Sequence, residues 1–389
     1  MRRLNLAFLK YRVEINAISL LVLACLLVFT PIVLAQVSYS GDYHYYIMTA
    51  NEWRTLGQVS DPSLRPLYWF TIALVDATMP LALPNAAILA TVAYYALAAV
   101  VIYAWFRASA VARGRAWLGA LVLCLTLVAP LSPVLFTSTR AYIIDTLQIS
   151  PHHNPTTMVT RPFALLALIW GATAFVREGA RWRVWALPLA MVASLLIKPN
   201  WAIAFLPAWG IWGAWRVLSE RRLPYMPLVV STFAVTLGVL VAQYLFTFGE
   251  GGIVLAPFEA LLRGELNNVG ELAIVTALSI AFPLLMLAHP DARRDSAVQL
   301  AWLTFAVAFL QGILLNESGV RRWHGNFLWG SMLTGWVLFV ACARVLWVRL
   351  AQARLSVLER VAWGVLLAHS VMGVLWGVAH MLPRAVLLH

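Results

Sequence analysis

Long uncharged hydrophobic runs alternate with short charged segments along the whole chain. A helix needs about 20 apolar residues to cross the hydrocarbon core of a bilayer. The pattern therefore predicts an all-α, polytopic transmembrane helical bundle of about eleven spans. Runs near the full length occupy residues 15–37, 85–106, 116–137, 223–248, 296–315, 325–343 and 361–381, and shorter runs occupy 162–176, 184–197, 199–215 and 272–288.

Residues 66–83 decide how the spans are counted. The stretch is apolar up to Val75, but Asp76, Pro80 and Pro84 interrupt it, so we expect it to lie at the interface instead of crossing. If it does not cross, the loops on the side of the N-terminus hold 19 of the 28 Lys and Arg residues; if it crosses, they hold 11. Because cytoplasmic loops are enriched in Lys and Arg, we expect a cytoplasmic N-terminus and an outer C-terminus.

Composition narrows the class of protein further. The chain of 389 residues is 62% hydrophobic and only 11% charged, which excludes an ordinary soluble enzyme, a disordered chain and a nucleic-acid binder. The net charge of +12 is spread over short clusters between the spans. We expect one domain, residues 1–389, crossing a plasma (inner) membrane many times, with membrane lipids as partners and no nucleic acid. Its external loops would be 38–84, 138–160, 249–271 and 316–324.

The first external loop combines an acidic residue with a helical pattern. Asp42 is expected to N-cap a juxtamembrane helix that runs to Leu56 and stops at Gly57. Its functional alternative is a general base at the mouth of a lipid-facing cavity. One face of this helix carries the large side chains and suits the outer interface: Tyr43, Tyr46, Ile47, Ala50 and Trp53.

The second external loop gathers Arg140, Asp145, His152 and His153 within twenty residues. These side chains suit either an anion site for phosphate or, together with Asp42, a metal site. The plain alternative is a proline-rich turn with its histidines at the wet interface. A helical pair of metal-binding histidines is absent from the sequence, so the spacing alone does not favour a metal.

Two further places put charge where the membrane makes it costly. Lys198 lies between two short runs, 184–197 and 199–215, so its turn is expected below the outer membrane surface, facing a cavity or reaching the headgroups. A second cluster, on the outer side, contains Glu317, Arg321, Arg322 and His324. Paired arginines on that side suggest a phosphate ligand, with Glu317 orienting a guanidinium; the alternative is a local Glu317–Arg321 ion pair.

The order of these features resembles a known family. A first span is followed by Gly41-Asp42-Tyr43 with Tyr45-Tyr46, then by Arg-Pro-Leu-Tyr-Trp at 65–69, a span ending in Arg107, and a loop with Arg140 and Asp145. Over residues 15–160 this is similar to the GT-C fold of integral-membrane glycosyltransferases, the polyprenyl-phosphate-sugar mannosyl- and aminoarabinosyltransferases.

The resemblance implies an activity and a set of roles. A sugar would pass from a polyprenyl-phosphate donor to a lipid or glycan acceptor at the extracytoplasmic face. Asp42 would be the base, and Asp145 would assist it or hold a divalent cation, Mg²⁺ or Mn²⁺; a single Asp, where many members of the family have paired acids, leaves metal dependence open. Substrate-binding residues would be Arg65, Arg140, His152, His153, Lys198, Glu317, Arg321, Arg322 and His324.

Two other classes of function also fit the sequence. A polysaccharide polymerase or ligase with lipid-diphosphate donors would depend on Arg321 and Arg322 more than on Asp42. A transporter or flippase for a lipid-linked anion would suit the broken spans at 184–215, although the halves of the chain show no internal repeat. Neither the sugar nor the oligomeric state follows from the sequence.

Overall fold

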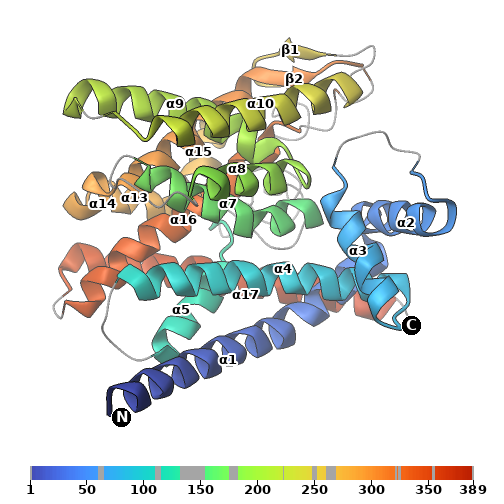
Figure 1. Ribbon diagram of the computed structural model, residues 1–389, viewed down its shortest axis with the longest axis horizontal. Helices are drawn as coiled ribbons and strands as arrows, with labels where there is room; N and C mark the ends of the chain where they lie inside the picture. Colours follow the sequence, from blue (N-terminus) through green and yellow to red (C-terminus); the bar gives the residue numbers. More distant parts are fainter. Residues whose placement is uncertain are drawn as a thin grey trace.

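The computed structural model is a bundle of apolar helices (Figure 1). Among the described residues, six helices are long and apolar enough to cross a membrane, so the chain is a multi-pass membrane protein; the count of about eleven crossings stays a prediction. The structure describes residues 2–59, 65–109, 115–131, 154–174, 183–221, 223–247, 252–259, 269–319, 322, 326–352 and 355–387. The six helices are α1 (Arg2–Tyr39), α4 (Leu83–Ser109), α10 (Met226–Thr247), α15 (Ser296–Leu314), α16 (Leu328–Ala351) and α17 (Val357–Leu387).

Shorter helices fill the bundle and cap its ends. They are α2 (Gly41–Leu56), α3 (Leu67–Thr78), α5 (Arg115–Thr126), α7 (Pro155–Thr173), α8 (Arg183–Leu195), α9 (Asn200–Glu220), α12 (Val269–Ser279), α13 (Ala281–Met286) and α14 (Pro290–Arg294). Two short strands, β1 (Ile253–Leu255) and β2 (Leu315–Glu317), pair antiparallel with Val254 opposite Asn316. The all-α expectation therefore holds apart from this ribbon, which joins the predicted third and fourth external loops.

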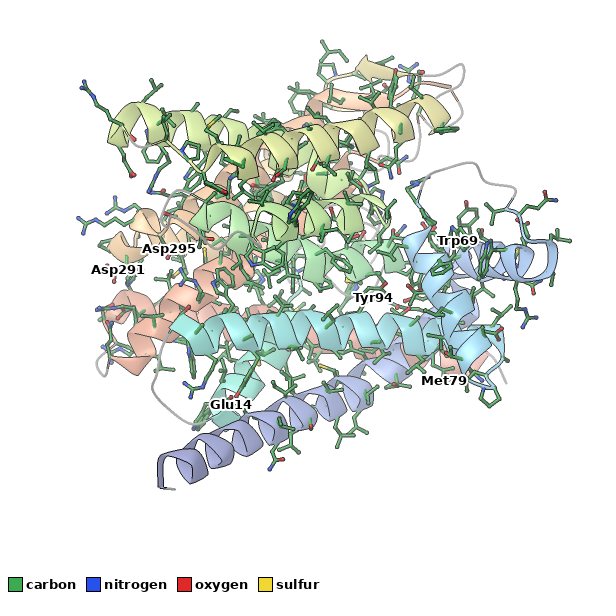
Figure 2. The ribbon with its side chains drawn as sticks, viewed as in Figure 1. Glu14, Trp69, Met79, Tyr94, Asp291 and Asp295 are labelled. Atoms are coloured by element: carbon green, nitrogen blue, oxygen red, sulfur yellow. The ribbon has the colours of Figure 1, made fainter. Side chains whose placement is uncertain are left out.

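The elements define two ends of the molecule. Figure 1 shows α2, α3 and the β1–β2 ribbon at one end, and the N-terminus and α14 toward the other. Figure 2 places Trp69 and Met79 at the first end and Asp291 and Asp295 at the second. We call these the α2 end and the α14 end. All four predicted external loops contribute described residues to the α2 end or to elements that begin or finish there.

Burial separates the central helix from the outer ones. In the most hydrophobic window of α16, 89% of the residues are buried, against 22% in α10. Helix α10 thus presents most of its apolar surface outward, as a lipid-facing helix does. Inside the bundle, Arg161 of α7 is fully buried, and its guanidinium carbon lies 4.5 Å from the centre of the Trp336 ring of α16.

Two of the predicted spans are interrupted in the structure. The run 116–137 was expected to be one helix, but α5 ends at Thr126 because Pro130 lacks an amide hydrogen and its ring would collide with the carbonyl of the preceding turn. The chain then continues without helix to residue 131. In this segment, the Ala129 amide donates to the His369 carbonyl at 3.0 Å. The run 272–288 is also divided, between α12 and α13 at Ile280.

Ion pairs hold the α14 end together. Arg107 of α4 donates to Glu14 of α1 at 3.1 Å, and Arg349 donates to the buried Glu359 of α17 at 2.8 Å. His289 lies 3.0 Å from the same Glu359 carboxylate. These charged side chains link the ends of neighbouring helices. The predicted site residues that the structure brings together lie at the α2 end.

Candidate functional site

Helices α2 and α3 form the outer part of the α2 end. Helix α2 ends at Leu56, and Gly57 follows in the left-handed conformation with φ of 67°, as predicted. Part of its predicted apolar face packs against protein: Tyr43 and Ala50 are buried, and the Tyr46 ring contacts the Tyr68 ring edge-on, whereas Trp53 is exposed. The placement of this helix at the outer interface stays a prediction.

The prediction that Asp42 caps this helix is wrong. Ser40 occupies the N-cap position, and Asp42 lies in the first turn of α2. Its Oδ2 accepts a hydrogen bond of 2.9 Å from Nδ2 of Asn154, which lies 112 residues further along the chain. The half-buried carboxylate is therefore directed toward the start of α7 and away from its own helix end.

Asn154 is a site residue that the sequence reasoning missed. It is the N-cap of α7, where its Oδ1 accepts from the amide of Thr156 at 2.9 Å and from the Thr156 hydroxyl, and Pro155 takes the first helical position. An asparagine followed by proline is a typical helix start, so the sequence did carry the signal for the cap. The contact with Asp42 had no local signal.

Lys198 lies in the turn between α8 and α9, as predicted, and it is only 7% exposed. Its Nζ lies 4.2 Å from the centre of the Trp329 ring of α16, a cation–π contact. The lysine is thus enclosed by protein. Trp329 is a second residue that the sequence reasoning missed.

Two other predicted site residues, Asp42 and Arg65, interact electrostatically with Lys198. Burial lowers the pKa of Lys198, the nearby Asp42 carboxylate opposes this shift, and the Arg65 guanidinium adds to it. Arg65 is held close because the next residues bond to the lysine turn: the Leu67 amide donates to the Leu196 carbonyl at 2.9 Å. One carboxylate and two cations therefore share this end of the bundle.

The lysine turn is also linked to the predicted fourth loop. Nδ2 of Asn200 donates to the Asn326 carbonyl at 2.6 Å, and Nδ2 of Asn326 donates to Oε2 of Glu317 at 2.7 Å. Glu317 is 8% exposed. Among the described residues, its carboxylate thus orients an asparagine beside the site, and no guanidinium is hydrogen-bonded to it.

Arg322 points elsewhere. Its guanidinium forms a two-pronged ion pair with Glu259, with Nε 2.9 Å from Oε1 and Nη2 3.1 Å from Oε2. Nearly half of the arginine side chain is exposed. The structure therefore gives Arg322 a partner across the β1–β2 ribbon and does not bring it to Lys198. The other predicted site residues, Arg140, Asp145, His152, His153, Arg321 and His324, lie outside the described residues.

The side chains present at this site limit the chemistry that it can carry out. Within the described part of the chain, no three His, Cys, Asp or Glu side chains converge in a way that could hold a metal ion, so Mg²⁺ or Mn²⁺ stays a prediction. The three charged groups suit two tasks: Asp42 can accept a proton, and Arg65 and Lys198 can offset negative charge on a ligand. A proton acceptor next to paired cations fits transfer chemistry with an anionic leaving group.

Comparison with protein-family models finds no match to this sequence, and comparison with curated proteins finds none either. The class of the protein therefore rests on its fold: a helical, multi-pass membrane protein with a charged site at one end of the bundle.

Proposed function

We propose that this protein is a membrane glycosyltransferase of the GT-C type, which transfers a sugar from a polyprenyl-phosphate donor to a lipid or glycan acceptor at the extracytoplasmic face. The observation that carries the proposal is the gathering of Asp42, Arg65 and Lys198 at the α2 end from three separate segments of the chain. Helices with much exposed apolar surface, such as α10, would offer an apolar surface to a prenyl tail.

The proposed reaction uses each group for one step. The carboxylate of Asp42 accepts the proton of an acceptor hydroxyl while that oxygen forms a bond to the anomeric carbon of the donor sugar. The bond between this carbon and the phosphate oxygen breaks, and its electron pair leaves on the polyprenyl phosphate. Lys198 and Arg65 stabilise the negative charge that grows there, in surroundings where burial strengthens electrostatic attraction.

The test is turnover in detergent. Purified protein is incubated with a panel of polyprenyl-phosphate sugars and candidate acceptors, and mass spectrometry follows released polyprenyl phosphate and glycosylated product. We expect Asp42→Asn to lower turnover at least ~100-fold, the range that a general base contributes, while the thermal midpoint changes little. Asp76→Asn is the matched control, because that acid lies at the same end but pairs with Arg54 at 2.7 Å.

The outcomes separate the three classes of function. Full turnover in the Asp42→Asn variant would show that the base is misplaced. If lipid-diphosphate donors react and polyprenyl-phosphate sugars do not, the polymerase or ligase interpretation gains, and loss of activity in Arg321→Ala would support it. Donor binding without any product would favour a transporter.

A further inference from the structure

Asn154 uses both ends of its side-chain amide at once. Its oxygen accepts from the amide and hydroxyl of Thr156, so the oxygen is committed to the N-terminus of α7. The nitrogen must then point away from α7, and it donates to Oδ2 of Asp42. Because the cap fixes which amide atom faces which way, the amide can only donate to Asp42.

The first turn of α7 leaves little else to bind an anion. Pro155 has no amide hydrogen, the amide of Thr156 is capped, and the amide of Thr157 donates to the Asn154 carbonyl at 3.2 Å. The helix end therefore acts on Asp42 through the side chain of Asn154. It does not offer a ring of free amides to a substrate phosphate.

The second carboxylate oxygen of Asp42, Oδ1, differs from Oδ2 in its surroundings. Among the described residues, Asn154 is the single hydrogen-bond partner of the Asp42 side chain, and it occupies Oδ2. In the same part of the chain, nothing is hydrogen-bonded to Oδ1 of this half-buried carboxylate, whose charge also reaches Lys198. The two oxygens are thus made unequal by one amide, which fixes the rotation of the carboxylate.

We propose that Asn154 is the positioning residue of this site, holding Asp42 by Oδ2 so that Oδ1 is the atom that accepts the proton of the acceptor hydroxyl. This inference rests on the proposed function for the proton transfer, but the hold itself is a property of the fold. It joins the first external loop to the start of α7 through one hydrogen bond between segments that are remote in the sequence.

Exchanging Asp42 and Asn154 tests the hydrogen bond between them by stability alone, with no activity assay. In Asn154→Asp the helix keeps a good N-cap, but two carboxylates face each other. We expect the thermal midpoint in detergent to fall by roughly 2 to 4 °C at pH 8, where both are ionised, and by less than half of that at pH 5, where they can share a proton.

The double variant Asp42→Asn/Asn154→Asp restores one amide and one carboxylate with their places exchanged. We expect its midpoint to return to within about 1 °C of the wild type at both pH values, because the amide again donates to the carboxylate. If the double variant loses as much as the two single variants together, or if Asn154→Asp is equally affected at pH 5 and pH 8, the proposed contact is refuted.

A kinetic measurement then connects the hold to the reaction. Asn154→Ser keeps a cap but is too short to reach Asp42, so kcat should fall about 10-fold with KM little changed. In Asn154→Asp the acid limb of the pH–rate profile should move up by about one pH unit. An unchanged kcat and profile would overturn the positioning role. If the wild type shows no turnover, the proposed function fails, and the exchange experiment still decides the contact.

Discussion

At the scale of single residues, the site is decided by what surrounds each charge. Lys198 illustrates this, because a lysine at a helix turn is ordinary on a surface and costly in a protein interior. Here Trp329 covers its ammonium group, and the opposite charges of Arg65 and Asp42 both act on it. The sequence placed the lysine at the turn, but only the packing shows that it is enclosed.

The lowered pKa of Lys198 predicts a pH dependence of anion binding. Because burial lowers its pKa, Lys198 loses its proton at a lower pH than a free lysine does, so attraction for a phosphate weakens as the pH rises. We expect the affinity for farnesyl phosphate, measured by calorimetry in detergent, to fall about 10-fold between pH 6.5 and pH 9.

Lys198→Arg is the matched control for this titration. An arginine keeps its charge over the whole range, so its affinity should change only through the titration of the phosphate itself. Lys198→Met should bind weakly at every pH. Parallel pH curves for the wild type and Lys198→Arg would contradict the assignment of Lys198 as the titrating cation.

At the scale of elements, interrupted helices shape the interior. After α5 ends, the non-helical segment from Leu127 to Leu131 bonds with His369 of α17 and with Leu278 of α12. His369 supports this segment, since one ring nitrogen lies 2.6 Å from the Ala129 carbonyl and the ring contacts Phe339 edge-on. The His369 side chain is fully buried, and its other ring nitrogen, Nε2, has no hydrogen-bond partner among the described residues.

A glycine of α17 allows this segment to approach the helix closely. A methyl group on Gly373 would collide with the backbone carbonyl of Leu127, whereas one on Gly364 of the same helix would meet nothing. We expect Gly373→Ala to lower the thermal midpoint in detergent clearly, at a cost of about 1–3 kcal/mol or more, because backbone must move to admit the methyl group.

Gly364→Ala should be neutral or slightly stabilising, since alanine is the better helix former. The pair therefore measures the close approach alone, free of helix propensity. Equal midpoints for the two alanine variants would show that the extended segment does not lie against α17 as described.

At the scale of the whole molecule, both ends contain ion pairs, but the enclosed site lies at only one of them. The α14 end is held by paired charges such as Arg107 with Glu14, and the α2 end collects the predicted external loops and the enclosed site. Helix α3 is only 12 residues long and packs on α2 and α4, with Ile72 and Ala73 buried. A helix of that length rises about 18 Å, too little to cross a bilayer core.

The predicted orientation can be measured with single cysteines. In a background with the three native cysteines replaced by alanine, Asn51→Cys and Arg293→Cys place one thiol on the exposed surface of each end. An impermeant maleimide should label the first only in right-side-out vesicles and the second only in inverted vesicles. Labelling of both in right-side-out vesicles would mean that residues 66–83 cross after all.

The sequence by itself determined what depends on runs of neighbouring residues. Hydrophobic length gave the membrane class and the positions of the long helices, and Gly57 and Lys198 marked a helix end and a turn, because each of these is set within a few residues. Local pattern failed where a proline ended α5 early and where Asp42 looked like a cap.

Only the tertiary structure decided which side chains meet. Asp42 bonds to Asn154 across 112 residues, Lys198 lies over Trp329, and Arg322 pairs with Glu259 instead of joining the site. Each contact depends on the depth and rotation of one helix against another, which packing of the whole bundle sets. No run of neighbouring residues carries that information, so the site could be predicted by residue type and only in part by partner.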